Sequence, residues 1–320
     1  GHPVRPNRAP LERQDLIFPE LDDNSINFDV SIAYCPERVM PGKHYLKSII
    51  EYPRVFSGMT KRASEICREF LENVIDVEKY PLTELESTTA SETAKVLENT
   101  YRAVNIAFID EWTKYAEAVG IDLFQIINAI QTRDTHSNIR FPGLGVGGYC
   151  LTKDPAFAPA AAKDFFGLDL DFPFSKLAVK TNNAMPLHTV DRLKSSLNNE
   201  IKNKKILIFG VTYRQDVGDT RYSASQILVN NLADLGAELT CHDPYLSFWE
   251  ETKQRVINDY PDLSSYDAVI LAVGHSEYKN KELDYWSRSK LLLDANMVLS
   301  SNEVKDLKDK NVQVVCIGRG

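Results

Sequence analysis

The sequence predicts an α/β protein in which a helical central region precedes a doubly wound parallel sheet. Two observations predict this class. From Ser91 to Val119 the chain contains no Gly or Pro, and its apolar residues recur at spacings of three and four, as on a helix that buries more than one side. After Lys204, runs of continuous apolar residues alternate with helical patterns, which is typical of βαβ units.

The N-terminal part is expected to hold little regular structure. Residues 1–28 are rich in Pro, Asn, Asp and Arg and are interpreted as a loose lead-in. A short strand is expected over residues 29–34. The following CPERVMPG segment, Cys35–Gly42, has two prolines and a glycine that break regular structure. A helix is expected over about residues 61–74, and a strand near residues 73–77.

The central part is expected to be helical. Ser91 or Thr89 could cap the start of the long helix, and Gly120 is placed to end it. A helix of this length with apolar residues on several sides typically packs against a partner element or a second subunit. Shorter helices are expected near residues 122–131, 154–165 and 174–198.

The C-terminal part, about residues 200–320, is expected to form the parallel sheet. A helix is expected over Ser223–Leu235. A polar loop, Tyr213–Ser223, follows the first expected strand, at the position where open α/β sheets bind ligands. The expected strands cover residues 204–210, 237–243, 266–273, 291–295 and 312–318.

Composition excludes several classes of partner. The 320 residues carry a formal charge of −8, which argues against a nucleic-acid or anionic-membrane surface. No apolar run reaches transmembrane length. The cysteine count is odd and there is no CxxC, so a reducing cytoplasm is the expected location. The histidines are scattered without ligand spacing, and no metal site is expected.

The segment Phe141–Pro155 contains four glycines before Cys150, with Lys153 and Asp154 following. So many glycines are disfavoured inside helices and strands, and they suit a backbone that passes close to another group. A cysteine beside a lysine is a setting that stabilises the thiolate, which predicts a nucleophile. The alternative is a glycine-rich turn followed by an inert, buried cysteine.

Lys95 and Asn99 lie four residues apart on the long helix and therefore share one face. Together they could donate hydrogen bonds to a developing oxyanion. The alternative is a solvated lysine beside a surface asparagine. Glu37, between two prolines, is an exposed carboxylate on the simplest interpretation.

The polar loop after the first C-terminal strand contains two arginines that could bind phosphate, because a guanidinium offers bidentate geometry. These are Arg214 and Arg221. The alternative is a loop that neutralises itself, with Asp216 and Asp219 paired to the two arginines.

Four motifs occur in a characteristic order: PER-x-x-PG, K-x-x-x-N, G-x-G-G-x-C-x-x-x-D and Y-R-x-D-x-x-D-x-R-x-S. Together they resemble the UDP-glucose/GDP-mannose dehydrogenase family over about residues 29–320. The CPERVMPG form is similar to the branch that oxidises UDP-N-acetylhexosamines. The resemblance implies an NAD-dependent, two-step oxidation of the sugar's C6 alcohol to a uronic acid. It also implies a homodimer formed through the long helix.

The resemblance implies a role for each matching residue. Cys150 would attack the C6 aldehyde and carry the thioester. Lys95 and Asn99 would stabilise the oxyanion, Asp154 would carry protons with Lys95, and Glu37 would assist thioester hydrolysis. Substrate-binding roles are implied for Phe141, Gly143, Gly147, Gly148, His136, Arg140 and Arg214, and cofactor contacts for Lys153 and Arg221.

Two departures from the family pattern affect these expectations. No G-x-G-x-x-G precedes Asp29, so residues 1–90 are expected to be a remnant of an NAD-binding domain, in a truncated chain that is inactive alone. Residues 91–199 would form the central catalytic and dimerisation domain, and 200–320 the UDP-sugar domain. His136 replaces an arginine common in the family, and Arg140 could compensate. The alternatives are a UDP-sugar-binding module without redox activity and a dimerisation fragment without a ligand.

Overall fold

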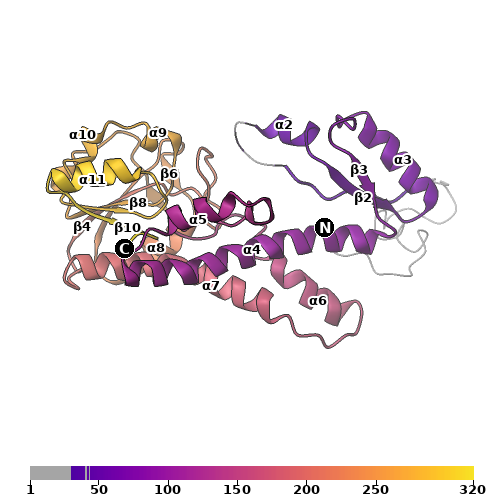
Figure 1. The fold of residues 1–320 in the computed structure, drawn as a ribbon, viewed down its shortest axis with the longest axis horizontal. Helices are drawn as coiled ribbons and strands as arrows, with labels where there is room; N and C mark the ends of the chain where they lie inside the picture. Colours follow the sequence, from indigo (N-terminus) through magenta and orange to yellow (C-terminus); the bar gives the residue numbers. More distant parts are fainter. Residues whose placement is uncertain (1–29, 40–41, 43) are drawn as a thin grey trace. The chain divides into compact units, whose positions relative to one another are not determined.

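The computed structural model describes residues 30–39, 42 and 44–320, which form two compact units (Figure 1). The first unit comprises the described residues up to Asn99 together with Ala156–Phe172. The second comprises Thr100–Pro155 and Pro173–Gly320. The predicted lead-in over residues 1–28, residue 29 of the predicted strand, and residues 40 and 41 of the CPERVMPG segment lie outside the described residues.

The first unit contains a three-stranded sheet in the order β1-β2-β3. Strands β2 and β3 are parallel and are joined through helix α3, whereas β1 pairs antiparallel with β2. The helix begins after Thr60, whose side chain accepts the backbone N–H of Ala63. The elements are β1 (Ala33–Tyr34), α2 (Tyr45–Ile50), β2 (Arg54–Gly58), α3 (Lys61–Glu72), β3 (Leu82–Glu84) and α6 (Phe157–Asp164).

The helix predicted over residues 61–74 is confirmed as α3, but the strand predicted near residues 73–77 is wrong. The amides of Val74 and Ile75 donate to the carbonyl of Leu71, so the chain continues in turns. Ile75 packs beside Phe56 and Leu71 in the core of this unit, which explains why an apolar residue occurs in this turn. Strands β2 and β3 were not predicted, because they are short and lack an apolar pattern of their own.

The predicted long helix is confirmed as α4 (Thr88–Val119), which has 32 residues. It begins earlier than predicted, and Ser87 caps it by accepting the amide of Ala90. Ser91 is buried instead, and its hydroxyl lies 2.5 Å from that of Ser57. Gly120 ends the helix in the left-handed conformation, with φ at 76°.

The second unit contains a five-stranded parallel sheet in the order β10-β9-β8-β4-β5, which confirms the predicted strands and the doubly wound class. The chain reverses direction of winding between β4 and β8, so the carboxyl ends of these strands flank the switch point where ligands bind in such sheets. The strands are β4 (Lys205–Phe209), β5 (Glu238–His242), β8 (Ala268–Leu271), β9 (Leu291–Asp294) and β10 (Gln313–Cys316).

Helices cover both faces of this sheet, as Figure 1 shows for α8 on one side and α9 to α11 on the other. Alternate residues of β4 enter two separate apolar clusters: Ile206 and Ile208 pack with α7 and α8, whereas Leu207 and Phe209 pack with α9 to α11. These helices are α7 (Pro173–Ser196), α8 (Ala224–Asp234), α9 (Ser276–Lys279), α10 (Leu283–Trp286) and α11 (Ser301–Asp309).

The remaining elements confirm the shorter predicted helices. Helix α5 (Leu123–Gln131) follows α4, and the segment expected to be helical from residue 154 is a 3-10 turn, η3 (Asp154–Ala156), that leads into α6. The described residues also contain two further short turns, η2 (Asp134–His136) and η4 (Leu263–Ser265), and a small hairpin, β6 (Phe248–Trp249) with β7 (Gln254–Arg255).

Among the helices of the described residues, none combines the length and apolar character that a membrane crossing requires.

Candidate functional site

The glycine loop, Phe141–Gly148, packs directly against the loop that follows β4. A Cβ on Gly147 would lie 2.8 Å from the Cβ of Tyr213 and from the carbonyl oxygen of Tyr222. Gly148 has φ at 82°, and a Cβ there would lie 2.8 Å from the Tyr213 ring. Both positions therefore require glycine, which explains the sequence pattern as a close approach between two loops.

The start of the same loop crosses the carboxyl edge of the sheet. The ring of Phe141 stacks on Phe124, with 5.8 Å between ring centroids. A Cβ on Gly143 would lie 3.0 Å from the side-chain oxygen of Asn296, and one on Gly145 would lie 2.9 Å from the Cβ of Ala224. The loop therefore contacts both the segment after β9 and the start of α8.

Cys150 lies in the turn after the glycine loop and is exposed. Its carbonyl accepts the amide of Asp154 at 2.9 Å. The other cysteines are half-buried or buried, and burial raises the pKa of each of their thiols. The alternative of a buried cysteine is therefore wrong for Cys150, which is the most exposed of the five thiols.

The ammonium of Lys153 forms an ion pair with Asp154, with 3.0 Å between Nζ and Oδ1. Asp154 is buried, so this cation compensates a carboxylate that burial would otherwise disfavour. Lys153 also lies 5.6 Å from the ring centroid of Tyr149. The predicted cluster of thiol, amine and carboxylate therefore exists, with the amine bonded to the carboxylate.

The loop Thr212–Arg221 neutralises one of its two arginines. Arg221 makes bidentate hydrogen bonds to Asp219, the shortest at 2.6 Å, which raise the pKa of Arg221 and lower that of Asp219. Asp216 points elsewhere: its carboxylate accepts hydrogen bonds from Ser276. Within the part of the chain that the structure describes, half-buried Arg214 forms no ion pair. The self-paired alternative is right for Arg221 and wrong for Arg214.

Glu37, Lys95 and Asn99 lie in the first unit. Lys95 donates to the backbone carbonyl of Glu37 at 2.5 Å, and the neighbouring Arg38 bonds to Glu98 on the same helix at 3.2 Å. The PER motif is thus fastened to α4 at two successive residues. Asn99, one helical turn beyond Lys95, is 1% exposed, so the alternative of a surface asparagine is wrong.

His136 and Arg140 occupy different surroundings. His136 is exposed at the end of η2, where its Nδ1 lies 2.9 Å from the hydroxyl of Thr135. Arg140 is half-buried, and burial, followed by the positive charge of Arg102, lowers the pKa of its guanidinium. Arg140 is therefore the less exposed of the two cationic candidates at this position.

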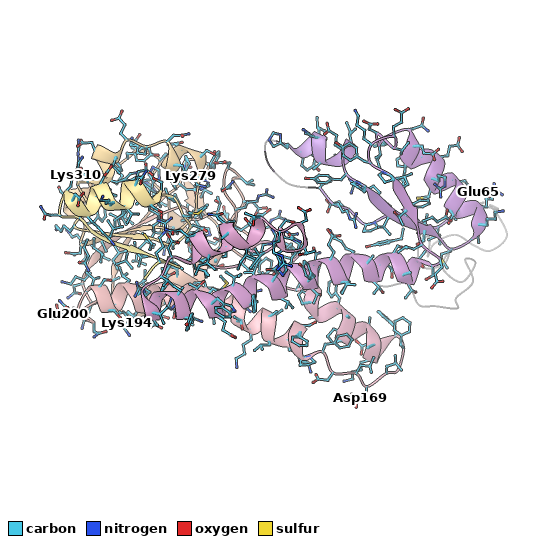
Figure 2. The ribbon with its side chains drawn as sticks, in the orientation of Figure 1. Glu65, Asp169, Lys194, Glu200, Lys279 and Lys310 are labelled. Atoms are coloured by element: carbon cyan, nitrogen blue, oxygen red, sulfur yellow. The ribbon has the colours of Figure 1, made fainter. Side chains whose placement is uncertain are left out.

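Sequence reasoning missed two fully buried residues beneath the Thr212–Arg221 loop, His275 and Asp243. Asp243 follows β5 directly, and its carboxylate accepts the amide of Val211 at 2.9 Å. Their position after the carboxyl ends of strands is the signal that could have identified them. A separate hollow at the other end of β4, lined by residues such as Lys194 and Glu200 (Figure 2), does not belong to this site.

Parallel strands on both sides of a switch point define an α/β protein of the doubly wound class. Two models of one family match the chain: the central domain over residues 89–184 and the UDP-binding domain over residues 207–301. The chain belongs to the UDP-glucose/GDP-mannose dehydrogenase family.

Similar curated proteins include the UDP-N-acetyl-D-mannosamine dehydrogenase of Methanocaldococcus jannaschii, which is 32% identical over 85% of this chain and 61% of that protein. The NDP-N-acetyl-D-galactosaminuronic acid dehydrogenase of Ralstonia solanacearum is 30% identical over 92% of this chain and 66% of that protein. This chain therefore spans about three fifths to two thirds of the length of these relatives.

Similar solved structures include an NDP-N-acetyl-D-galactosaminuronic acid dehydrogenase from Methanosarcina mazei Go1, with a TM-score of 0.78 and 27% identity over 90% of this chain and 62% of that one. The UDP-D-ManNAc dehydrogenase of Pyrococcus horikoshii has a TM-score of 0.75 and 27% identity over 91% of this chain and 65% of that one.

Proposed function

We propose that this protein acts in a nucleotide-sugar 6-dehydrogenase that oxidises the C6 alcohol of a UDP-sugar, a UDP-N-acetylhexosamine, to a uronic acid through a thioester on Cys150. The family and the match to its UDP-binding domain support the substrate class. The names of the similar curated proteins support an N-acetylated sugar. The observation that carries the proposal is the exposed thiol of Cys150 at the end of a glycine loop packed beside Arg214's loop.

The second unit would bind the nucleotide and supply the nucleophile. Arg214 would bind the diphosphate, and the glycine loop, packed against Tyr213, would place Cys150 beside the loop that contains Arg214. The thiolate of Cys150 would add to the C6 aldehyde, forming the S–C bond while the carbonyl electrons move to oxygen. Asp154, bonded to Lys153, would accept and return protons at this step.

The first unit would supply the groups that stabilise charge. Lys95 and Asn99 share one face of α4, and both donate hydrogen bonds, as an oxyanion requires. Glu37 would take a proton from the water that attacks the thioester carbon, after which the C–S bond breaks and the thiolate leaves.

We propose NAD as the electron acceptor of the complete reaction, as the family resemblance implies, but the described residues do not form its cradle. Among the described residues of the first unit, strands β2 and β3 and helix α3 form one parallel βαβ motif, and protein groups already occupy the N-terminus of its helix. The side chain of Thr60 accepts the amide of Ala63, and a Cβ on Gly58 would lie 2.2 Å from the amide nitrogen of Ser64. A pyrophosphate needs such amides for itself. The roles given above therefore concern the sugar nucleotide alone.

Alkylation by iodoacetamide, followed by peptide mass spectrometry, tests whether the thiol of Cys150 is exposed and lies beside the bound sugar nucleotide. Cys150 should react first, because the remaining thiols are shielded and their raised pKa values keep them protonated. Saturating UDP-N-acetylglucosamine should slow this reaction, and NAD should not. The unfolded chain, in which all five cysteines react, is the control for reagent quality. Labelling of Cys150 that no UDP compound slows would refute the placement of the thiol beside the sugar.

A UDP-sugar-binding protein without redox activity is the second candidate. The observation that favours it is the closed helix N-terminus in the first unit. Calorimetry with UDP-N-acetylglucosamine, UDP-N-acetylmannosamine and NAD separates the two functions. Binding of the UDP-sugars without any uronic acid formation, even when the chain is tested within a complete dehydrogenase supplied with NAD, would support the binding protein.

We also propose that a second copy of the chain covers the aromatic face of α4. Phe108, Trp112 and Tyr115 form a continuous row, with ring centroids 6.2 and 5.6 Å apart, and each is 44–55% exposed. Such a row is costly in water and typical of a subunit interface. The variant Trp112→Glu should sediment as a monomer in analytical ultracentrifugation, whereas Lys114→Glu on the neighbouring helix face should not change the assembly.

A further inference from the structure

His275 connects the strand ends of the sheet to the Thr212–Arg221 loop. It lies between β8 and α9, where it is fully buried, and neither of its ring nitrogens faces solvent. The backbone amide of Asp216 donates to Nδ1 at 2.9 Å. On the other side of the ring, Nε2 lies 3.1 Å from a carboxylate oxygen of Asp243 and 3.2 Å from the hydroxyl of Thr212.

These contacts determine the tautomer of the neutral ring. A backbone amide can only donate, so Nδ1 must carry a lone pair, and the proton of the neutral imidazole lies on Nε2. That proton points to Asp243 and Thr212. The hydroxyl of Thr212 donates to the carbonyl of Arg214 at 3.0 Å, so it remains an acceptor toward His275. The set of donors and acceptors is consistent throughout.

The bond from Asp216 matters because this residue has an unfavourable backbone conformation. Its φ is 58°, in the left-handed region, which is disfavoured for residues that carry a side chain. The carboxylate of Asp216 is held by the amide and hydroxyl of Ser276, at 2.8 and 2.6 Å, and by the hydroxyl of Tyr245 at 3.2 Å. His275 and Ser276, consecutive in sequence, thus fasten the backbone and the side chain of the same residue.

We propose that His275 is a positioning residue that holds the segment Thr212–Asp216 in the conformation that presents Arg214 to the diphosphate of the nucleotide sugar. The inference rests on the proposed function, because it takes the diphosphate as the ligand of Arg214. His275 contacts the segment at both ends, at Thr212 and at Asp216, and Arg214 lies between them.

The titratable groups around the ring come from several elements. Burial acts to raise the pKa of Asp216, but hydrogen bonds from Ser276 and Tyr245 outweigh it, so the pKa lies below its ordinary value. Two aromatic rings lie against the imidazole, with centroids 5.0 and 5.1 Å away. The complete set is Asp216, Asp243, His242, Tyr245 and Tyr278.

Two substitutions separate the two hydrogen bonds of the ring. In His275→Asn the amide oxygen can replace Nδ1 as the acceptor for Asp216, but the bond to Asp243 is lost. In His275→Gln the longer amide can replace Nε2 as the donor to Asp243, but the acceptor for Asp216 is lost. We expect His275→Asn to bind UDP-N-acetylglucosamine within about threefold of the original protein, and His275→Gln to bind at least about tenfold more weakly.

Calorimetry with UDP-N-acetylglucosamine at a single pH measures the affinities of the original protein and of both variants. The higher affinity should belong to His275→Asn, because only this variant keeps an acceptor for the Asp216 amide. Equal affinities of the two variants would overturn the positioning role.

Amide hydrogen exchange of the Thr212–Asp219 segment keeps the inference separate from the proposed function. Exchange should be faster in His275→Gln than in His275→Asn, with or without a nucleotide. If no form of the protein binds a UDP-sugar, the proposed function fails, and the exchange rates still decide whether His275 holds the segment. Equal exchange in both variants would remove the inference even if the nucleotide binds.

Discussion

The glycine loop Phe141–Gly148 and the loop Thr212–Arg221 pack against each other, yet different physical causes maintain their conformations. The glycine loop has its path because side chains are absent: at Gly147 and Gly148 a Cβ would collide with Tyr213. The other loop has its path because buried polar groups hold it, through His275 and Ser276. One loop depends on a local composition, and the other depends on partners about sixty residues away.

The difference explains how the two loops divide the proposed work. The glycine loop is held by close packing, and Cys150, which follows it, stays exposed and can act as a nucleophile in the proposed reaction. A loop held by hydrogen bonds can commit one arginine to structure and keep another for a ligand, as Arg221 and Arg214 show. Substitution of Cys150 should therefore lower the rate of product formation, whereas substitution of Arg214 should lower the affinity for UDP.

The largest effect should come from Cys150→Ser, which removes the nucleophile but leaves both loops packed. In the complete dehydrogenase in which this chain is proposed to act, uronic acid formation from a UDP-sugar and NAD should fall at least about 10³-fold, while the affinity for the UDP-sugar stays within about twofold. Product formation is followed by mass spectrometry. The half-buried Cys67→Ser serves as the control and should retain its rate. Parental turnover in Cys150→Ser would show that another group forms the covalent bond.

The second comparison contrasts the two arginines. Arg214→Ala should weaken UDP binding about 10–100-fold, because charge-assisted hydrogen bonds contribute about 1.5–3 kcal/mol. Arg221→Ala should weaken it much less, since its guanidinium already bonds to Asp219. Isothermal calorimetry with UDP measures both affinities. Equal losses would mean that the Asp219 pair opens on binding and that the two arginines are not distinct.

Gly148→Ala tests the close packing of the glycine loop, and Gly120→Ala is its matched control. Both glycines have positive φ, at 82° and 76°, but a Cβ on Gly120 would meet nothing within 4 Å. We expect Gly120→Ala to lower the free energy of unfolding by about 1 kcal/mol, from backbone strain alone. Gly148→Ala should lower it by about 2–3 kcal/mol, because Tyr213 must also move. Urea titration measures both, and similar values would mean that Tyr213 adapts at no cost.

The smallest effect concerns pH. His242 is the last residue of β5. Burial lowers the pKa of its imidazole from the ordinary value of 6.5. The folded protein therefore binds fewer protons than the unfolded chain between the lowered pKa and 6.5. The free energy of unfolding should fall as the pH drops below 6.5, by at most about 1.4 kcal/mol per pH unit, and should gain nothing from this residue above it. His242→Gln should have a shallower slope than exposed His136→Gln, and equal slopes would contradict this origin.

Local patterns in the sequence determined much of the second unit. The strands of the parallel sheet are continuously apolar because both faces are covered, and this property can be read without the structure. The length of α4 and its end at Gly120 were equally visible. The order of four motifs identified the family, because each motif places chemistry at a fixed distance from a glycine, proline or helix.

Only the tertiary structure decided the rest. The pair β2 and β3 forms because α3 lies between them, and the apolar residue Ile75 that suggested a strand is a core residue in a turn. The sequence left both arginines of the second loop equivalent. The fold distinguished them, because Ser276 binds Asp216 and leaves Asp219 for Arg221. Hydrogen bonds between residues sixty positions apart leave no local pattern, so His275 became visible only when the strand ends met.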